Sequence, residues 1–234
     1  MIVQKIIDKV IEKLKKKKPM FSEYQMVKQS VLKKGYVWRE RGDYDVNLIF
    51  VRMSDHVSNM MDDKCYISYM ALGVEYCILV DSNTKPALYG ALYNPVTVNG
   101  VTGTACLIPQ QVLEAHKYIN NLWNDTKENA YNPWLQPYFQ QYKPLKIWRD
   151  NNRNDIIDHM QEEDGPVSDG LCIHIQEEPL SAPGKKPWSL GCVGLHKQDF
   201  KDQLDPIMKK RVAAYGLLND FTLLENSDLL IPIE

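Results

Sequence analysis

Short runs of apolar, β-branched and aromatic residues recur along this chain from Tyr36 onward, and they constrain its fold more than any other feature. Runs of this kind, separated by polar turns with glycine or proline, are typical of strands in a mixed or antiparallel sheet. The runs are Val46–Val51, Cys65–Tyr69, Glu75–Asp81, Gly103–Pro109, Lys146–Trp148 and Phe221–Leu224. The sequence therefore predicts a β-rich core.

Two helices are predicted ahead of these strands. Apolar residues recur at helical spacing over residues 2–14, which predicts an amphipathic helix. A capping box at Ser22–Gln25 begins a second helix, and Gly35 is expected to end it in the left-handed conformation. We expect this helical segment, residues 1–35, to pack on a domain formed by residues 36–234. Binding of a protein partner through these helices is the alternative.

Two later regions complete the expected organisation. Gln110–Tyr142 is rich in Trp, Tyr, Asn and Gln, and we interpret it as a lid or insertion that packs its aromatic rings inward. A groove for glycan or peptide is the alternative. Asp205 and Pro206 are typical of the N-cap and first position of a helix. That helix is predicted to run to about Asn219.

Composition excludes several classes of function. A net charge of −2 makes no case for nucleic-acid or membrane binding. The cysteines are scattered without a CxxC pair, so neither a disulfide framework nor a zinc site is expected. Asp150, Asn152 and Asn154 alternate as in a calcium loop, but the glycine and the distal glutamate of that loop are missing. No metal or organic cofactor is expected.

His174 and Cys192 are the candidate catalytic pair. A cysteine attacks as its thiolate, and an imidazole within hydrogen-bond reach takes the proton and later returns it to the leaving group. A tetrahedral intermediate also needs N–H donors, which the bend at Gly191 can supply. Spacing alone does not distinguish this pair from a buried cysteine and a core histidine.

Three ordered blocks around this pair resemble a known family. His174 is followed, after a loop, by Ser189, Gly191 and Cys192. This pattern resembles the signature of the L,D-transpeptidase catalytic domain family. The likeness is closer to a divergent branch from phage and gut-bacterial genomes, on the blocks Arg149–Asp155, Gly170–His174 and Trp188–Cys192. The sequence departs from the family at Leu190, where a second histidine is usual, and at Gly194, where Asn or Arg is usual.

The resemblance implies an α+β fold with a β-rich, sandwich- or barrel-like catalytic domain. It also implies that Cys192 is the nucleophile and that His174 is the general base and then the general acid. The carbonyl of Ile175 would orient the ring, and the N–H groups of Gly191 and Cys192 would bind the oxyanion. Ser189 completes the catalytic set.

Four further residues are candidates for contact with substrate. Arg149 has the geometry to bind a carboxylate with two hydrogen bonds. Trp188 and Leu190 flank Ser189, and Leu190 is interpreted as a change of substrate. Cys172 lies two residues before His174 and would share its face on a strand, so its sulfur would line the pocket or pack beneath it.

The resemblance implies acyl transfer on peptidoglycan stem peptides through a thioester, with an amine or water as the acceptor. A cell-wall amidase and a non-catalytic wall-binding module are the alternatives. Met1–Lys18 lacks the pattern of a signal peptide. We therefore expect synthesis in the cytoplasm and delivery to the wall through phage lysis or a non-classical secretion route.

Overall fold

The structure is a computed structural model of the 234-residue chain. It describes residues 21–88, 97–98, 101–124, 126, 132–150, 152–157, 162–167, 170–180 and 191–229. The helix expected over residues 2–14 lies outside these ranges.

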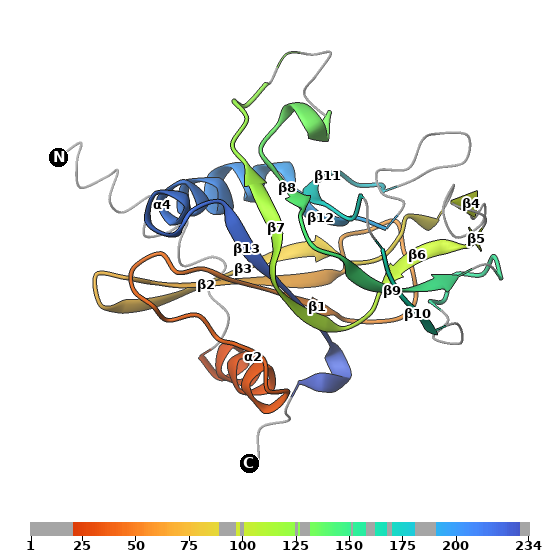
Figure 1. The fold of residues 1–234 in the computed structure, drawn as a ribbon, viewed down its shortest axis with the longest axis horizontal. Helices are drawn as coiled ribbons and strands as arrows, with labels where there is room; N and C mark the ends of the chain where they lie inside the picture. The colour runs from red at the N-terminus through yellow and green to blue at the C-terminus, as the bar shows by residue number, and fades with distance from the viewer. Residues whose placement is uncertain are drawn as a thin grey trace.

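Eight strands close into a barrel, so that each of them pairs with two neighbours (Figure 1). The pairs β1–β13 and β11–β12 are parallel and the other pairs are antiparallel. This confirms the prediction of a β-rich, mixed sheet. In order around the barrel the strands are β1 (Asn47–Arg52), β13 (Leu218–Glu225), β7 (Gln110–Ile119), β8 (Tyr138–Gln141), β11 (Ile173–Gln176), β12 (Val193–His196), β3 (Val74–Asn83) and β2 (Asp63–Ala71).

The barrel interior is filled by alternate residues of these strands, as the period of two in a strand requires. Phe50 of β1 stacks on Phe221 of β13, with ring centroids 5.8 Å apart. Ile173 and Ile175 of β11 and Val193 and Leu195 of β12 are buried in the same core. The residues between them on β11 and β12 therefore face out of the barrel.

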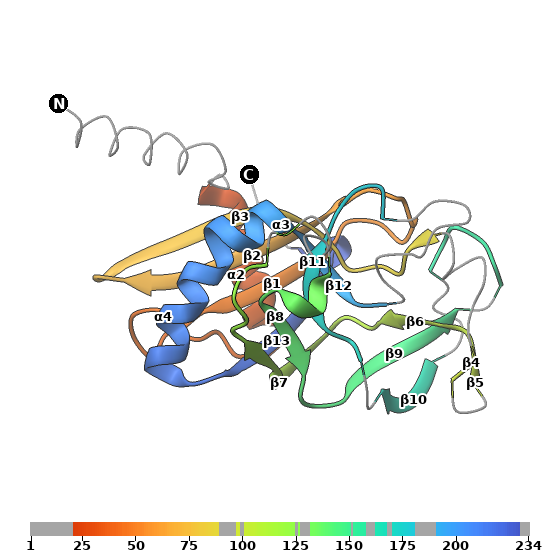
Figure 2. The ribbon, with the colours of Figure 1, turned by 90° about the horizontal axis from the view of Figure 1, so that it is seen from above.

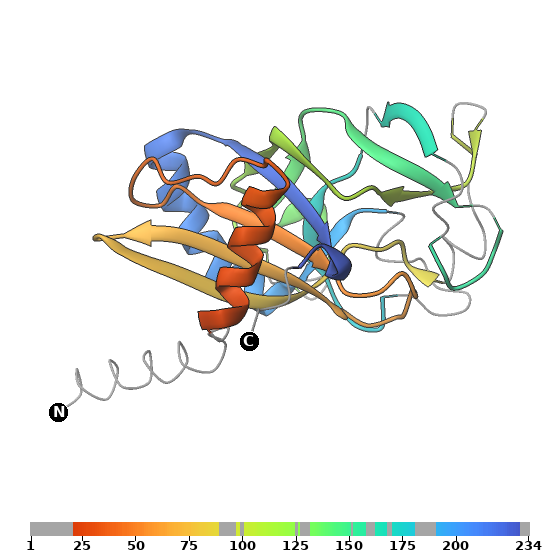
Figure 3. The ribbon, with the colours of Figure 1, turned by 90° about the horizontal axis from the view of Figure 1, so that it is seen from below.

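Helix α2 (Phe21–Lys33) crosses the outer face of the barrel over β1 and β2 (Figure 3). Its Val27 and Val31 are buried against Ile49 and Val51 of β1. The chain leaves the helix through Gly35, whose φ is 73°. A helix and its glycine stop are thus present where the second helix was predicted, but the capping box was wrong, because Ser22 already lies inside the helix.

A longer helical segment crosses the other side of the barrel (Figure 2). It consists of α3 (Lys197–Asp199), a π-helical turn (Phe200–Leu204) and α4 (Asp205–Tyr215). Phe200, Leu204, Ile207 and Met208 pack into the barrel core.

The predicted limits of this helix were wrong at both ends. Helical structure begins at Lys197, and the wider π-helical turn carries it into Pro206, which has no N–H for an ordinary helical bond. The carboxylate of Asp205 is buried and accepts from Trp123 and Tyr118 rather than capping a helix. The segment ends before Gly216, whose φ is 82°, and residues 218 and 219 already belong to β13.

The interpretation of Gln110–Tyr142 as a lid or insertion was wrong for much of the segment, because its two ends are barrel strands, β7 and β8. Between them lie a loop and a short 3₁₀ turn, η2 (Pro133–Leu135). Inward packing holds for Tyr118, which is buried, whereas Trp134 and Tyr142 are exposed.

Two smaller sheets lie at one end of the barrel (Figure 1). One has three strands and carries the predicted strand at Lys146–Trp148 in its centre. A 3₁₀ turn, η4 (Asn226–Asp228), follows the last barrel strand. The strands of the small sheets are β10 (Glu162–Val167), β9 (Leu145–Asp150) and β6 (Thr104–Leu107) in one, and β4 (Thr97–Val98) and β5 (Val101–Thr102) in the other.

Candidate catalytic site

The candidate site is built on the parallel pair β11–β12. In this pair His174 lies opposite Gly194, and Ile173 lies opposite Val193. The N–H of Val193 donates to the carbonyl of Cys172 over 3.0 Å. The pairing therefore brings Cys172 and Cys192 together, at the points where the two strands begin.

The ring of His174 is held in one orientation. Its Nδ1 lies 2.7 Å from the carbonyl oxygen of Ile175. Because a carbonyl oxygen only accepts, Nδ1 carries the proton and Nε2 keeps its lone pair. Burial lowers the pKa of His174 to about 4, so the ring is neutral at pH 7. A buried, neutral imidazole with a fixed tautomer has the protonation state that a general base needs.

Trp134 lies against this ring. The indole and imidazole centroids are 5.3 Å apart and their planes are inclined by 58°. The carbonyl of Trp134 accepts from the side chain of Asn121 over 3.0 Å, which holds the η2 turn in place. Trp134 is 48% exposed, so one part of the indole shields His174 while the rest faces solvent.

The sulfur of Cys192 lies on the bend that precedes β11. Its Sγ is 3.0 Å from the carbonyl oxygen of Gly170, and the N–H of Cys172 points to it over 3.4 Å. Among the described residues, no hydrogen bond joins this sulfur to His174. The structure thus brings the two predicted catalytic residues to adjacent strands without a hydrogen bond between sulfur and ring.

The thiols of Cys172 and Cys192 interact with one another. A hydrogen bond from the Cys192 thiol lowers the pKa of Cys172 to about 7. The same interaction, together with burial, raises the pKa of Cys192 well above its usual range. The pair therefore loses its first proton easily and its second with difficulty. Of the two residues, Cys192 is the more exposed.

The bend at 170–172 is tied to the barrel wall by two side chains. His116 of β7 donates from Nε2 to the carbonyl of Leu171 over 2.9 Å, and Gln141 of β8 accepts from the N–H of Leu171 over 2.8 Å. Burial lowers the pKa of His116 to about 4, so this ring is also neutral. His116 therefore acts on the site by holding its backbone.

Close packing explains the glycine before Cys192. A Cβ on Gly191 would lie 2.6 Å from the carbonyl oxygen of Ala105, and the φ of Gly191 is 139°. Only glycine fits this approach and this backbone conformation without strain. Ala105 belongs to β6, so the three-stranded sheet forms one wall beside the candidate nucleophile.

The glycine after Cys192 has a partner that the sequence did not reveal. A Cβ on Gly194 would lie 2.1 Å from Cδ of Gln176, because that side chain lies over β12. Gln176 donates to the carbonyl of Cys192 over 3.4 Å and accepts from Asn83 over 3.3 Å. Gly194 stands at the position where Asn or Arg is usual in the family that the sequence resembles. In this chain the side chain of Gln176, from the neighbouring strand, covers it.

The remaining predicted site residues lie on β9 or outside the described residues. Arg149 lies opposite Ala105 in the pairing of β6 with β9, and its Nη1 donates to the carbonyl of Gly103 over 3.3 Å. Trp188, Ser189 and Leu190 lie outside the described residues. Trp134 and Gln176 were missed. The only signal for Gln176 was its place two residues after His174, on the same face of the strand.

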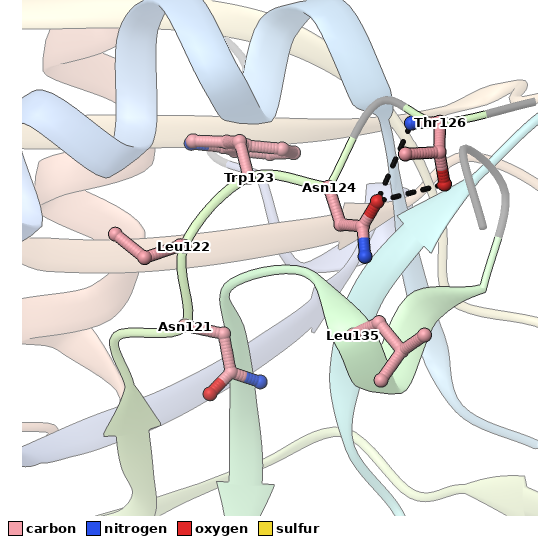
Figure 4. Close-up of a pocket in the computed structure, with 6 residues that line it drawn as sticks. All are labelled: Asn121, Leu122, Trp123, Asn124, Thr126 and Leu135. Carbon is pink, nitrogen blue, oxygen red and sulfur yellow. Dashed lines mark hydrogen bonds between the residues drawn. The ribbon is translucent and has the colours of Figure 1, made fainter.

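A hollow of about 520 Å³ is lined by the loop that follows β7 and by Leu135 of the η2 turn (Figure 4). Its lining combines the indole of Trp123 with amide and hydroxyl groups. The side chain of Asn124 accepts from the N–H and hydroxyl of Thr126 (Figure 4). The lining residues are Asn121, Leu122, Trp123, Asn124, Thr126 and Leu135.

Within the described parts of the chain, no group of three or more His, Cys, Asp or Glu side chains is arranged to hold a metal ion. The helices described here are all too short or too polar to cross a membrane. No family model matches the chain, and neither a curated protein nor a solved structure matches it.

Proposed function

We propose that this protein is a cysteine-nucleophile enzyme that cleaves an amide bond by acyl transfer through a thioester. The observation that carries the proposal is the neutral imidazole of His174, held through Nδ1 on the strand beside Cys192. A cysteine beside a positioned, neutral base is the arrangement that thiol acyl transfer requires.

In the proposed reaction, Sγ of Cys192 attacks the acyl carbon and Nε2 of His174 takes the thiol proton. The N–H groups of Gly191 and Cys192 are the proposed donors to the oxyanion. Collapse of the tetrahedral intermediate breaks the C–N bond, and His174 returns the proton to the departing amine. An amine or water then attacks the thioester and releases Cys192.

One movement must precede this reaction. The sulfur of Cys192 lies on the carbonyl of Gly170, so its side chain must turn before the sulfur can donate its proton to the imidazole. Catalytic hydrogen bonds often form only in the complex with substrate. The pKa of the Cys192 thiol is raised well above its usual range, so His174 must take the thiol proton as the sulfur attacks.

The proposed substrate is a peptidoglycan stem peptide, on the strength of the motif blocks that include His174, Gly191 and Cys192. Arg149, Trp188 and Leu190 are the proposed contacts with that peptide, and Ser189 supports the catalytic loop. An enzyme with this substrate acts at the cell wall, so delivery by lysis or secretion belongs to the proposal. Replacement of a motif histidine by Leu190 is proposed to alter the choice of acceptor.

A non-catalytic wall-binding module is the second candidate. It is favoured by one observation: in the structure the sulfur of Cys192 contacts the bend at Gly170 and Cys172 rather than His174. A binding module predicts that Cys192→Ala binds sacculi as tightly as wild type and that neither protein changes the muropeptides.

The test is incubation of the full chain with purified sacculi and with stem-peptide muropeptides, followed by mass spectrometry of the products. Wild type is expected to cut or join stem peptides, and Cys192→Ala and His174→Gln to reduce turnover by at least a hundredfold. Cys77→Ala is the matched control, since Cys77 lies on β3 outside the site.

Intact-mass measurement with a carbapenem separates the outcomes. One adduct on wild type and on Cys77→Ala, absent from Cys192→Ala, supports an acyl-accepting Cys192. Rapid alkylation of Cys192 without an adduct or wall products favours an amidase with another substrate. Neither adduct nor selective alkylation would refute the enzyme.

A further inference from the structure

Cys172 has no part in the proposed acyl transfer, yet it lies beside the proposed nucleophile. The parallel register pairs Ile173 with Val193, so Cys172 and Cys192 occupy the preceding position on each chain. The bond from the N–H of Val193 to the carbonyl of Cys172 keeps the two chains together there. A second thiol held next to a nucleophilic one is a chemical arrangement of its own.

The spacing suits a covalent bond between the two sulfurs. Neighbouring strands lie about 4.8 Å apart, which falls within the range of about 4.4–6.8 Å that disulfides span between Cα atoms. Residues 173 and 193 both point into the core, so Cys172 and Cys192 share the opposite face. The sulfur of Cys192 already lies 3.4 Å from the backbone nitrogen of Cys172.

The other cysteines do not share this arrangement. All five cysteines lie in described parts of the chain, and none of them is in a disulfide. Cys65 is buried in the barrel core, Cys77 packs under α2 on the outer face, and Cys106 belongs to a separate cluster beside β9. Cys172 and Cys192 are therefore the pair whose thiols meet.

We propose that Cys172 and Cys192 form a redox-active dithiol that a hydroperoxide converts into a reversible disulfide. Formation of this bond does not depend on the proposed function, whereas its consequence for catalysis rests on it. A sulfur held in a disulfide cannot form a thioester. The oxidised protein is therefore inactive in acyl transfer until a thiol reductant restores it.

The chemistry is balanced in two steps. Cys192, the more exposed residue of the pair, passes its thiol proton to the thiolate of Cys172 and attacks the peroxide oxygen, so that an S–O bond forms, the O–O bond breaks and water leaves after protonation. The thiolate of Cys172 then attacks the sulfenic sulfur, the S–S bond forms and a second water leaves. Two thiols lose two electrons and one hydrogen peroxide gains them. A dithiol reductant reverses the bond by exchange.

The disulfide also has a protective consequence. A sulfenic acid that finds no second thiol is oxidised further to sulfinic and sulfonic acids, which thiols do not reduce. With Cys172 adjacent, the sulfenic acid of Cys192 is captured before that step. Removal of Cys172 is therefore expected to convert a reversible oxidation into an irreversible one.

The test treats the reduced full chain with a small excess of hydrogen peroxide and then maps its peptides without reduction. Wild type is expected to yield a peptide pair joined through Cys172 and Cys192, with loss of two hydrogens from the intact mass. Alkylation of Cys192 should disappear and return after dithiothreitol. A wild type that gains oxygen atoms on Cys192 without this crosslink overturns the proposal.

Variants sharpen the result. Cys172→Ser is expected to gain two or three oxygen atoms on Cys192, with at least tenfold less thiol recovered by dithiothreitol, while Cys77→Ser behaves as wild type. Cys172→Ala replaces it if the serine variant fails to fold. Equal recovery in wild type and in Cys172→Ser overturns the protective role. A crosslink in a protein that does not change the muropeptides refutes only the proposed function. Turnover of muropeptides without a crosslink refutes only this inference.

Discussion

Acid is expected to destabilise this protein through two buried histidines, His116 and His174. Burial lowers the pKa of both to about 4, whereas an unfolded histidine titrates near 6.5. Between those values the unfolded chain binds a proton at each position and the folded chain does not. By linkage, the free energy of unfolding falls as the pH falls through this window and is fully present above about pH 6.5.

The magnitude follows from the width of the window. Each pH unit below 6.5 costs about 1.4 kcal/mol for each histidine that stays neutral in the folded state. Lowering the pH from 7 to 5 therefore removes about 2 kcal/mol for each ring and about 4 kcal/mol for both. Against a total stability of roughly 5–15 kcal/mol for a domain, this is a large fraction.

The assay is urea unfolding at pH 7, 6 and 5, followed by tryptophan fluorescence. In wild type the free energy of unfolding is expected to fall by about 4 kcal/mol from pH 7 to pH 5. His116→Gln retains an N–H group that can reach the carbonyl of Leu171 but does not titrate, so its loss over the same range should be about half. His56→Gln, at an exposed histidine, is the control and should match wild type.

Comparison of each variant with itself across pH removes any fixed cost of the substitution. A wild-type free energy of unfolding that changes by less than about 1 kcal/mol between pH 7 and 5 would refute the reasoning. So would an unchanged pH dependence in His116→Gln. The first result would mean that both rings are solvated or already charged in the folded protein, and His174 would then not be a neutral base. The second would mean this of His116 alone.

Three further outcomes follow from the packing of the site. Gly194→Ala places a Cβ 2.1 Å from Cδ of Gln176 and should lower the free energy of unfolding, measured in urea, by about 1–3 kcal/mol. Adding Gln176→Ala should restore most of the lost stability, and no recovery would contradict this account. Gly191→Ala, with a backbone carbonyl 2.6 Å from the new Cβ, should slow alkylation of the site thiol by at least tenfold, and an unchanged rate would count against the packing. Tyr118→Phe removes the hydroxyl that donates to Asp205 and should cost about 1–3 kcal/mol in thermal unfolding; an unchanged midpoint would argue against that bond.

The strands that could be predicted are those whose residues carry the signal locally. Apolar residues predominate in Val46–Val51 and Glu75–Asp81, and these segments form β1 and β3 with small changes at their ends. Strand β7 was missed because its segment, Gln110–Ile119, mixes charged residues with apolar ones. Only three of its ten residues are buried, and only pairing with β13 and β8 selects the extended state.

The helix near the C-terminal end also has one part that the local sequence marks and one part that depends on tertiary packing. Pro206 is a good local marker of a first helical turn, and α4 does contain it in that turn. The helical residues before α4, Lys197–Leu204, have no such marker, and they form a helix because Phe200 and Leu204 are buried in the barrel core. Burial of these side chains in the barrel core, which the sequence pattern alone does not show, extends the helix upstream of its predicted start. The helix also ends before its predicted limit, and β13 begins there.

For the candidate site, the motif predicted which residues lie close together but not what surrounds them. His174, Gly191 and Cys192 are brought to neighbouring strands, and the contact of the ring with the carbonyl of Ile175 is present. Trp134 could not be placed from the sequence, because it reaches the site from a loop about 40 residues upstream and no local pattern marks that approach.

The spacing between the two candidate catalytic residues has a topological reason. Strands β11 and β12 are parallel, so the chain must return from the end of one to the start of the other, and such a crossover needs a dozen or more residues. The connection over residues 177–192 meets that requirement. A tight hairpin after β11 would have made the second strand antiparallel. The end of that second strand, rather than its start, would then have lain beside the start of β11. The long, turn-rich loop is thus what places Cys192 beside Cys172 and near His174. The same crossover accounts for both proposals, because it determines which imidazole and which second thiol the sulfur of Cys192 meets.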